Sequence, residues 1–122
     1  GVMTSVSKAF AETEGRRGIV IGVVPGIPAS NSTWNREAAG ETDPHSDLQD
    51  SIVAPQGYPN EYVELTIQTH LPASGNAGQS ISSRNHINIL SSDLVVALPG
   101  GAGTLSECLL AQRYKRPLLV FV

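Results

Sequence analysis

The sequence predicts an α/β fold built on a doubly wound parallel sheet with helices on both faces. Three observations indicate this class. Apolar runs of strand length recur along the chain, segments with helical spacing lie between them, and turn residues separate the two kinds. Strands that alternate with helices in this way form parallel sheets with right-handed crossovers.

The first half of the chain predicts one helix and two strands. Val2–Glu14 has apolar residues four apart, as on one face of a helix, and Gly15 follows as a stop. Gly18–Val24 is a continuous, largely β-branched run, which predicts a strand buried on both faces. Tyr62–Ile67 alternates polar and apolar residues, which predicts a strand with one more exposed face, nearer an edge.

The second half predicts a helix, a strand, a second helix and a last strand. The first helix takes a serine as its cap, because a serine hydroxyl can accept a hydrogen bond from a first-turn N–H group. The second helix ends where a proline follows two basic residues. In order, these elements are a helix capped by Ser82 or Ser83 and running through Leu90, a strand over Leu94–Leu98, a helix from Leu105 that ends at Lys115-Arg116-Pro117, and a strand over Leu118–Val122.

Two connecting segments stand apart from this pattern. Ile27–Asn60 shows no periodicity and predicts a long loop insertion, in which Trp34 and His45 are candidates for a lid. Leu71–Gly78 predicts a flexible connection.

The whole chain, residues 1–122, is expected to be one Rossmann-like domain. The chain opens on a helix with no strand before it and stops within or at the end of an apolar strand. A complete doubly wound domain would have more at both ends, so the sequence is expected to be an internal piece of a larger domain.

Composition excludes several classes of function. Hydrophobic residues make up 40% of the chain and aromatic residues 5%, so the core must be aliphatic. The net charge is −3 without a basic block, which argues against a nucleic-acid partner. Cys108 is the only cysteine, so a reducing compartment is expected. No run is long enough to cross a bilayer, and we expect a cytoplasmic protein.

The segment Leu94–Glu107 is the most informative one for function. It predicts a buried strand, a turn containing Gly100, Gly101 and Gly103, and the first turn of a helix. Glycines let the backbone approach a ligand closely, and a helix N-terminus presents unpaired N–H groups and a positive dipole end. The spacing matches neither the P-loop nor the dinucleotide fingerprint. We therefore predict a distinct phosphate site at this turn.

A capping box is the structural alternative for the same residues. Thr104 and Glu107 are three apart at a helix start, where each side chain can satisfy a backbone N–H group. The helix is then expected to bury Leu105, Cys108 and Leu109, so Cys108 is assigned no chemistry.

Four further side chains are candidates for ligand contacts. Arg84 could hold an oxyanion with its planar fork, or it could form a surface ion pair with Asp93 or Glu61. Asn85 and Asn88 could bind a ring edge or only cap and turn. His86, like His70, lacks the spacing and the carboxylate or thiol company of metal ligands, so no metal site is expected.

The sequence resembles the SLOG superfamily, which includes the Lonely Guy-type phosphoribohydrolases and proteins once labelled lysine decarboxylases. Pro99–Glu107 matches the superfamily's PGGxGTxxE motif at every fixed position. Members of the superfamily begin with a strand, a helix and a strand and continue past the last strand found here. The resemblance therefore implies that this sequence lacks the first strand-helix-strand unit and the C-terminal end. Within the superfamily, three segments are more similar to molybdenum cofactor carrier proteins. They are Pro59–Glu64, Thr69–Pro72 and Ser83–Asn88.

The resemblance implies a carrier that binds molybdenum cofactor, a phosphorylated pyranopterin, in a groove at the carboxyl ends of the strands. The carrier would protect its cargo and pass it to molybdoenzymes. It would be a homo-oligomer, a dimer or tetramer, and would use no catalytic metal. The cofactor-binding residues implied are Ser83, Arg84, Asn85, His86, Pro99, Gly100, Gly101, Ala102, Gly103, Thr104 and Glu107.

The superfamily also supplies an enzymatic alternative. A phosphoribohydrolase would cleave nucleoside 5′-monophosphates with Arg84 and Glu107 at the glycosidic bond. Those enzymes carry an Arg-Lys pair, whereas here Asn85 follows Arg84. A third alternative is a nucleotide-sensing domain without chemistry. Lys8 and Lys115 are the only lysines, and neither has a setting suited to pyridoxal phosphate, so decarboxylation is not expected.

Overall fold

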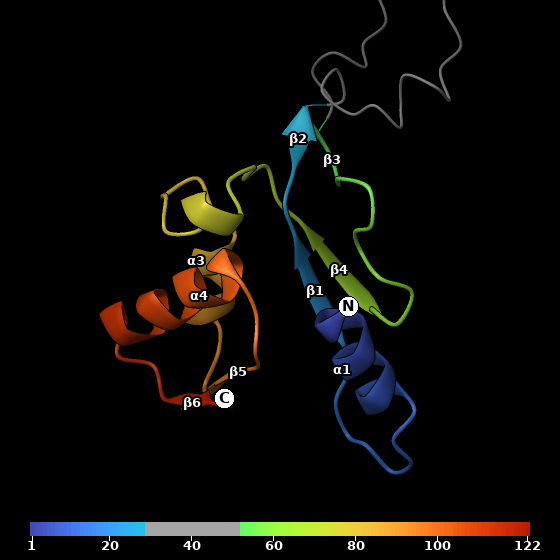
Figure 1. Ribbon diagram of the computed structural model, residues 1–122. Helices are drawn as coiled ribbons and strands as arrows, with labels where there is room; N and C mark the ends of the chain where they lie inside the picture. The colour runs from blue at the N-terminus through green and yellow to red at the C-terminus, as the bar shows by residue number, and fades with distance from the viewer. Residues whose placement is uncertain (29–51) are drawn as a thin grey trace, which may run out of the picture. The chain divides into compact units, whose positions relative to one another are not determined.

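The computed structural model describes residues 1–28 and 52–122. These residues form two compact units, Met3–His70 and Leu71–Val122, called here the first and the second unit (Figure 1). Both units mix helices and strands, as an α/β class requires. None of the described helices is long and apolar enough to cross a membrane.

The first unit is built on a parallel strand pair. Helix α1 (Val2–Ala11) precedes strand β1 (Ile21–Val24), which pairs in parallel with β4 (Leu65–Gln68). The short strands β2 (Ile27–Pro28) and β3 (Ile52–Val53) pair antiparallel (Figure 1). The strands predicted over Gly18–Val24 and Tyr62–Ile67 therefore pair in parallel, as a parallel sheet requires.

Several boundaries in the first unit differ from the prediction. Helix α1 stops at Ala11, before the expected Glu14, and Gly15 then adopts a positive φ of 72° that suits glycine. Ile21 is 52% exposed, and only Val24 of β1 is buried, so burial of the strand on both faces was wrong. Among the described residues of the first unit, β1 pairs with one strand, β4, and much of β1 is uncovered.

The long loop predicted over Ile27–Asn60 is described only at its ends. Those ends pair as β2 and β3, in the register of Ile27 with Val53. Trp34 and His45, the candidate lid residues, lie outside the described residues.

An ion pair fastens the end of α1 to the strands. The Arg16 guanidinium donates through Nη1 and Nη2 to the two Glu64 carboxylate oxygens, both at 2.8 Å. Arg16 also donates to the carbonyl oxygens of Ala11 and Gly18, and the Val20 N–H donates to Glu64 at 2.8 Å. The hydrogen bond from Arg16, followed by that from Val20, lowers the pKa of Glu64 below its ordinary value.

Acid is expected to weaken the first unit through this ion pair. Because the folded-state pKa of Glu64 is lowered, its stabilisation is complete above the unfolded pKa of about 4.3 and is lost as pH falls through the folded value. Glu64→Gln should therefore melt at a lower temperature at pH 7 and show a smaller further loss between pH 5 and pH 3. Thermal melting across this range measures the effect.

Glu61→Gln is the matched control, because Glu61 is an exposed carboxylate three residues away. It should keep the acid response of the original chain. Equal acid responses in the original chain and Glu64→Gln would contradict a role for the ion pair.

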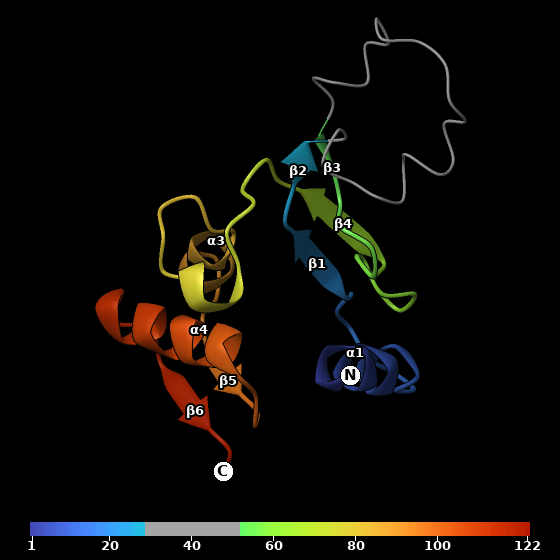
Figure 2. The same ribbon diagram turned by 45° about the horizontal axis from the view of Figure 1, so that its top comes forward.

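The second unit contains a complete strand-helix-strand crossover. Strand β5 (Val95–Ala97) leads through the glycine-rich turn into α4 (Ala102–Arg113), and β6 (Leu118–Val120) returns parallel to β5. Before them come the 3₁₀ helix η3 (Gly75–Ala77) and helix α3 (Asn85–Leu90). The two views place α3 alongside α4 (Figure 2).

The segment predicted as a flexible connection, Leu71–Gly78, is in part ordered. It contains η3, and Ala73 forms a parallel β-bridge with Ser83. The prediction was wrong here because the order comes from contacts with later residues: the Ser106 hydroxyl donates to the Gly75 carbonyl at 3.0 Å.

The core of the second unit lies between α3, α4 and the strand pair. Leu110 and Ala111 are fully buried and Ile89 is 3% exposed, with Val95 and Leu118 packed against them. The predicted apolar face of α4 was wrong: Leu105 is 61% exposed, Leu109 is 38% exposed and Cys108 is only part-buried. Leucines stand on several sides of this helix, so the contacts of α3 and β5, and not its periodicity, select the buried side.

Candidate functional site

The turn between β5 and α4 has the geometry of an anion site. Helix α4 begins at Ala102 with Gly101 as its N-cap, and no side chain donates or accepts a capping hydrogen bond there. Thr104 is the third residue of the helix and not its cap, so the predicted capping box was wrong. The first N–H groups of α4 are consequently left without a side-chain partner at a positive dipole end.

The three glycines of the turn differ in what they require. A Cβ on Gly100 would collide with the Thr104 hydroxyl, so packing demands glycine there. At Gly101 and Gly103 nothing lies within 4 Å of such a Cβ, and neither has a positive φ. Internal packing therefore explains neither Gly101 nor Gly103. Gly103 lies within α4, where glycine costs about 1 kcal/mol relative to alanine.

The entrance to α3 is a buried polar layer. Ser83 is fully buried, Asn85 is 4% exposed, and the Ser83 hydroxyl accepts a hydrogen bond from the Asn85 N–H at 3.2 Å. Arg84 is the N-cap of α3, and no side chain makes a capping hydrogen bond there, so the serine cap predicted at Ser82 or Ser83 was wrong. A Cβ on Gly78 would lie 2.7 Å from Asn85 Nδ2 and 2.8 Å from Ser106 Cβ. Asn85 of α3 and Ser106 of α4 therefore both pack against Gly78.

Arg84 lies at the same entrance and is 9% exposed. Burial of a guanidinium costs free energy unless hydrogen bonds or an anion compensate it. Its position at the start of α3 places it one helical turn before Asn88, whose N–H donates to the Arg84 carbonyl at 3.2 Å.

His86 is held within the second unit by both ring nitrogens. Nε2 lies 2.9 Å from the Ser80 carbonyl oxygen and Nδ1 lies 2.7 Å from the Tyr114 hydroxyl. A carbonyl can only accept, so in the neutral ring Nε2 carries the proton and Nδ1 accepts from Tyr114. This arrangement favours a structural role over a ligand contact.

Glu107 projects from α4 toward α3. The side-chain amide of Asn88 donates to Glu107 Oε1 at 3.4 Å, a long hydrogen bond that links the two helices. Glu107 is part-buried, and no hydrogen bond from another residue in the described parts of the chain reaches its second oxygen. That oxygen can accept a hydrogen bond from a donor group of a ligand.

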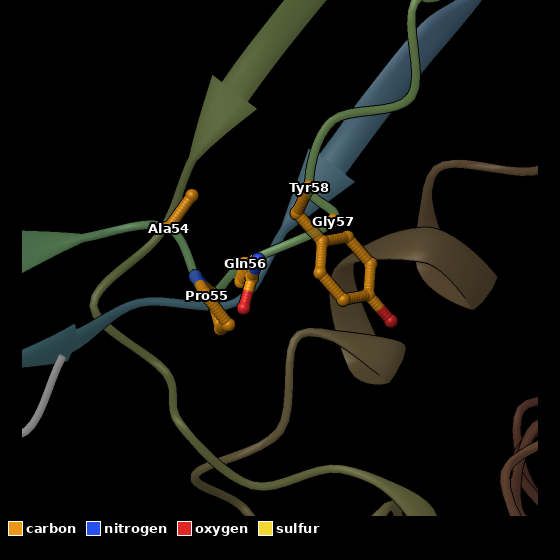
Figure 3. Close-up of a pocket in the computed structure, with 5 residues that line it drawn as sticks. All are labelled: Ala54, Pro55, Gln56, Gly57 and Tyr58. Atoms are coloured by element: carbon orange, nitrogen blue, oxygen red, sulfur yellow. The ribbon is translucent and has the colours of Figure 1, made fainter. Parts of the chain in front are cut away.

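A separate hollow of about 220 Å³ lies in the first unit. It is lined by five successive residues, Ala54, Pro55, Gln56, Gly57 and Tyr58 (Figure 3). None of them carries a positive charge or was predicted as a site residue, so the hollow is a poor place for an anion. Within residues 1–28 and 52–122, no three His, Cys, Asp or Glu side chains gather as metal ligands do.

Three residues of the second unit were missed from the sequence. Gly78 and Ser106 complete the buried layer around Asn85, and Tyr114 engages His86. The spacing of Gly75 and Gly78 gave no signal of a contact with α4. Ser106 lies within the Pro99–Glu107 motif, and this position was the signal that could have identified it.

A comparison with protein families decides the broader identity of the chain. The family model described as the SLOG cluster4 family matches residues 1–122. The chain belongs to the SLOG cluster4 family. No curated protein and no solved structure gives a significant match. Family membership agrees with the resemblance of the glycine-rich segment and favours a phosphorylated small molecule as ligand.

Proposed function

We propose that the chain binds the phosphate of a small molecule at the turn before α4, and that this molecule is molybdenum cofactor carried as cargo. The observation that carries the proposal is the start of α4, which no side chain caps. N–H groups at such an end stabilise an anion through hydrogen bonds and the helix dipole. Open space at Gly101 and Gly103 lets a phosphate come close to the backbone.

The charge distribution supports an anion in this half of the chain. Residues 71–122 contain four arginine or lysine side chains and two carboxylates, against a net charge of −3 for the whole chain. The net positive charge of this segment favours the long-range attraction of a phosphorylated ligand. The cargo would leave for a molybdoenzyme acceptor intact, because carrying it breaks no bond.

Retention of the cofactor through gel filtration tests the carrier proposal. The purified protein, incubated with molybdenum cofactor, should elute with stoichiometric molybdenum and pterin absorbance. Arg84→Ala should retain at most about a tenth as much, since a charge-assisted contact is worth roughly 1.5–3 kcal/mol. Arg113→Ala is the matched control, an exposed arginine of the same unit, and should retain the cofactor fully.

Failure to retain the cofactor would contradict the carrier proposal. Release of free base from nucleoside 5′-monophosphates would then support the phosphoribohydrolase. The part-engaged carboxylate of Glu107 is the observation that favours this second candidate, because such an enzyme needs a carboxylate within reach of the ribose.

A further inference from the structure

We infer that Asn88 is a positioning residue, which holds one oxygen of Glu107 so that the other accepts a hydrogen bond from an N–H or O–H donor of the bound anionic ligand. This inference rests on the proposed function. It adds a requirement on the ligand, namely a donor group at a fixed distance from its phosphate.

The contact between Asn88 and Glu107 engages one of the two carboxylate oxygens of Glu107. The Asn88 Nδ2 atom lies 3.4 Å from Glu107 Oε1, and within the described parts of the chain no other donor is bonded to Glu107. An ionised carboxylate only accepts hydrogen bonds and has capacity for several. The contact therefore limits the orientation of Glu107 without consuming its capacity.

Asn88 itself is firmly anchored. Its carbonyl oxygen accepts hydrogen bonds from the Ser92 hydroxyl at 2.6 Å and the Ser91 hydroxyl at 3.3 Å. The next residue, Ile89, is 3% exposed in the core that joins α3 to α4. These contacts fix the backbone of Asn88, which lowers the entropic cost of holding its side-chain amide against Glu107.

Glu107 and the glycine turn share one face of α4. Gly103 and Glu107 are four residues apart, a spacing that brings side chains to the same face. Four residues of an α-helix span about 6 Å. A phosphate at the helix start thus leaves room for a ring whose donors reach Glu107, whereas a second anionic group there would be repelled.

Guanosine 5′-monophosphate and inorganic phosphate are suitable probes. The nucleotide carries a phosphate and the N–H donors of a 2-amino-4-oxopyrimidine ring, and inorganic phosphate tests the turn alone. Affinities are measured by calorimetry for the original chain, Asn88→Ala, Glu107→Ala and the double variant. Asn76→Ala is the control, because Asn76 is an exposed asparagine of the same unit.

The expected result is a selective and non-additive loss. Asn88→Ala and Glu107→Ala should each bind the nucleotide about tenfold more weakly, and the double variant should bind no more weakly than Glu107→Ala. Phosphate affinity should not fall in any variant, and it should rise where the Glu107 charge is removed. Retained phosphate binding also shows that each variant is folded.

Three results would overturn this inference alone. In each of them, binding of inorganic phosphate would still support the proposed site at the turn. They are unchanged nucleotide affinity in Asn88→Ala, losses that multiply in the double variant, and a nucleotide bound no tighter than phosphate. An original chain that binds neither probe would overturn the proposed function and this inference together.

Discussion

Replacing Gly103 by aspartate is expected to abolish ligand binding while making the second unit more stable. The position has room for a side chain, so the fold can accept one. A carboxylate in the first turn of a helix is favourable by about 0.3–1 kcal/mol, and removal of a helical glycine adds to this gain. The same carboxylate would occupy the place of the phosphate. Affinity for inorganic phosphate or cofactor should fall at least about 100-fold, or roughly 2.7 kcal/mol.

Gly103→Ala separates charge from volume. Alanine should stabilise α4 by about 1 kcal/mol and retain more affinity than aspartate, because it adds a methyl group without a charge. Calorimetric titration gives the affinity and thermal melting gives the stability. Full affinity in Gly103→Asp would remove the turn from the site, whereas loss of folding in both variants would contradict the open space at this position.

Replacing Leu110 by alanine is expected to have the largest effect on stability. Leu110 is fully buried between α3, α4 and the strand pair. Truncation of a buried leucine costs about 2–5 kcal/mol, which is a large part of the stability of a small domain. Urea denaturation, followed by circular dichroism, should show a midpoint far below that of the original chain.

Leu105→Ala is the matched control on the same helix. Leu105 is 61% exposed, so its loss should change the free energy of unfolding by less than about 0.5 kcal/mol. The two variants make the same chemical change, and the difference between them measures burial. A larger loss in Leu105→Ala than in Leu110→Ala would restore the face of α4 that periodicity predicted.

The sequence predicted the order and type of the long elements well, because these follow from local patterning. The runs around Val95 and Leu118 became parallel strands with α4 between them, as alternation of strand and helix requires. The single continuous sheet of a Rossmann-like fold stays a prediction, since the two parallel pairs lie in different units. The expectation that residues 1–122 form one domain likewise stays a prediction.

The failures trace to residues whose environment comes from distant parts of the chain. Helix propensity places a boundary after Gly103, yet α4 includes this glycine, so the capping box at Thr104 did not form. His86 finds its partner in Tyr114, 28 residues away, a contact that no spacing rule reveals. The glycine turn could be predicted because all of its residues are consecutive in the sequence.

The parallel pairing of β5 with β6 has a consequence for the order of folding. The residues joined by β1 and β4 lie roughly twice as far apart in sequence as those joined by β5 and β6, and each doubling of a closed loop costs about 0.6 kcal/mol of chain entropy. Chain segments with more local contacts also form faster. The crossover that carries the glycine turn can therefore fold early. The residues of the proposed site then lie on the helix that nucleates folding of the second unit.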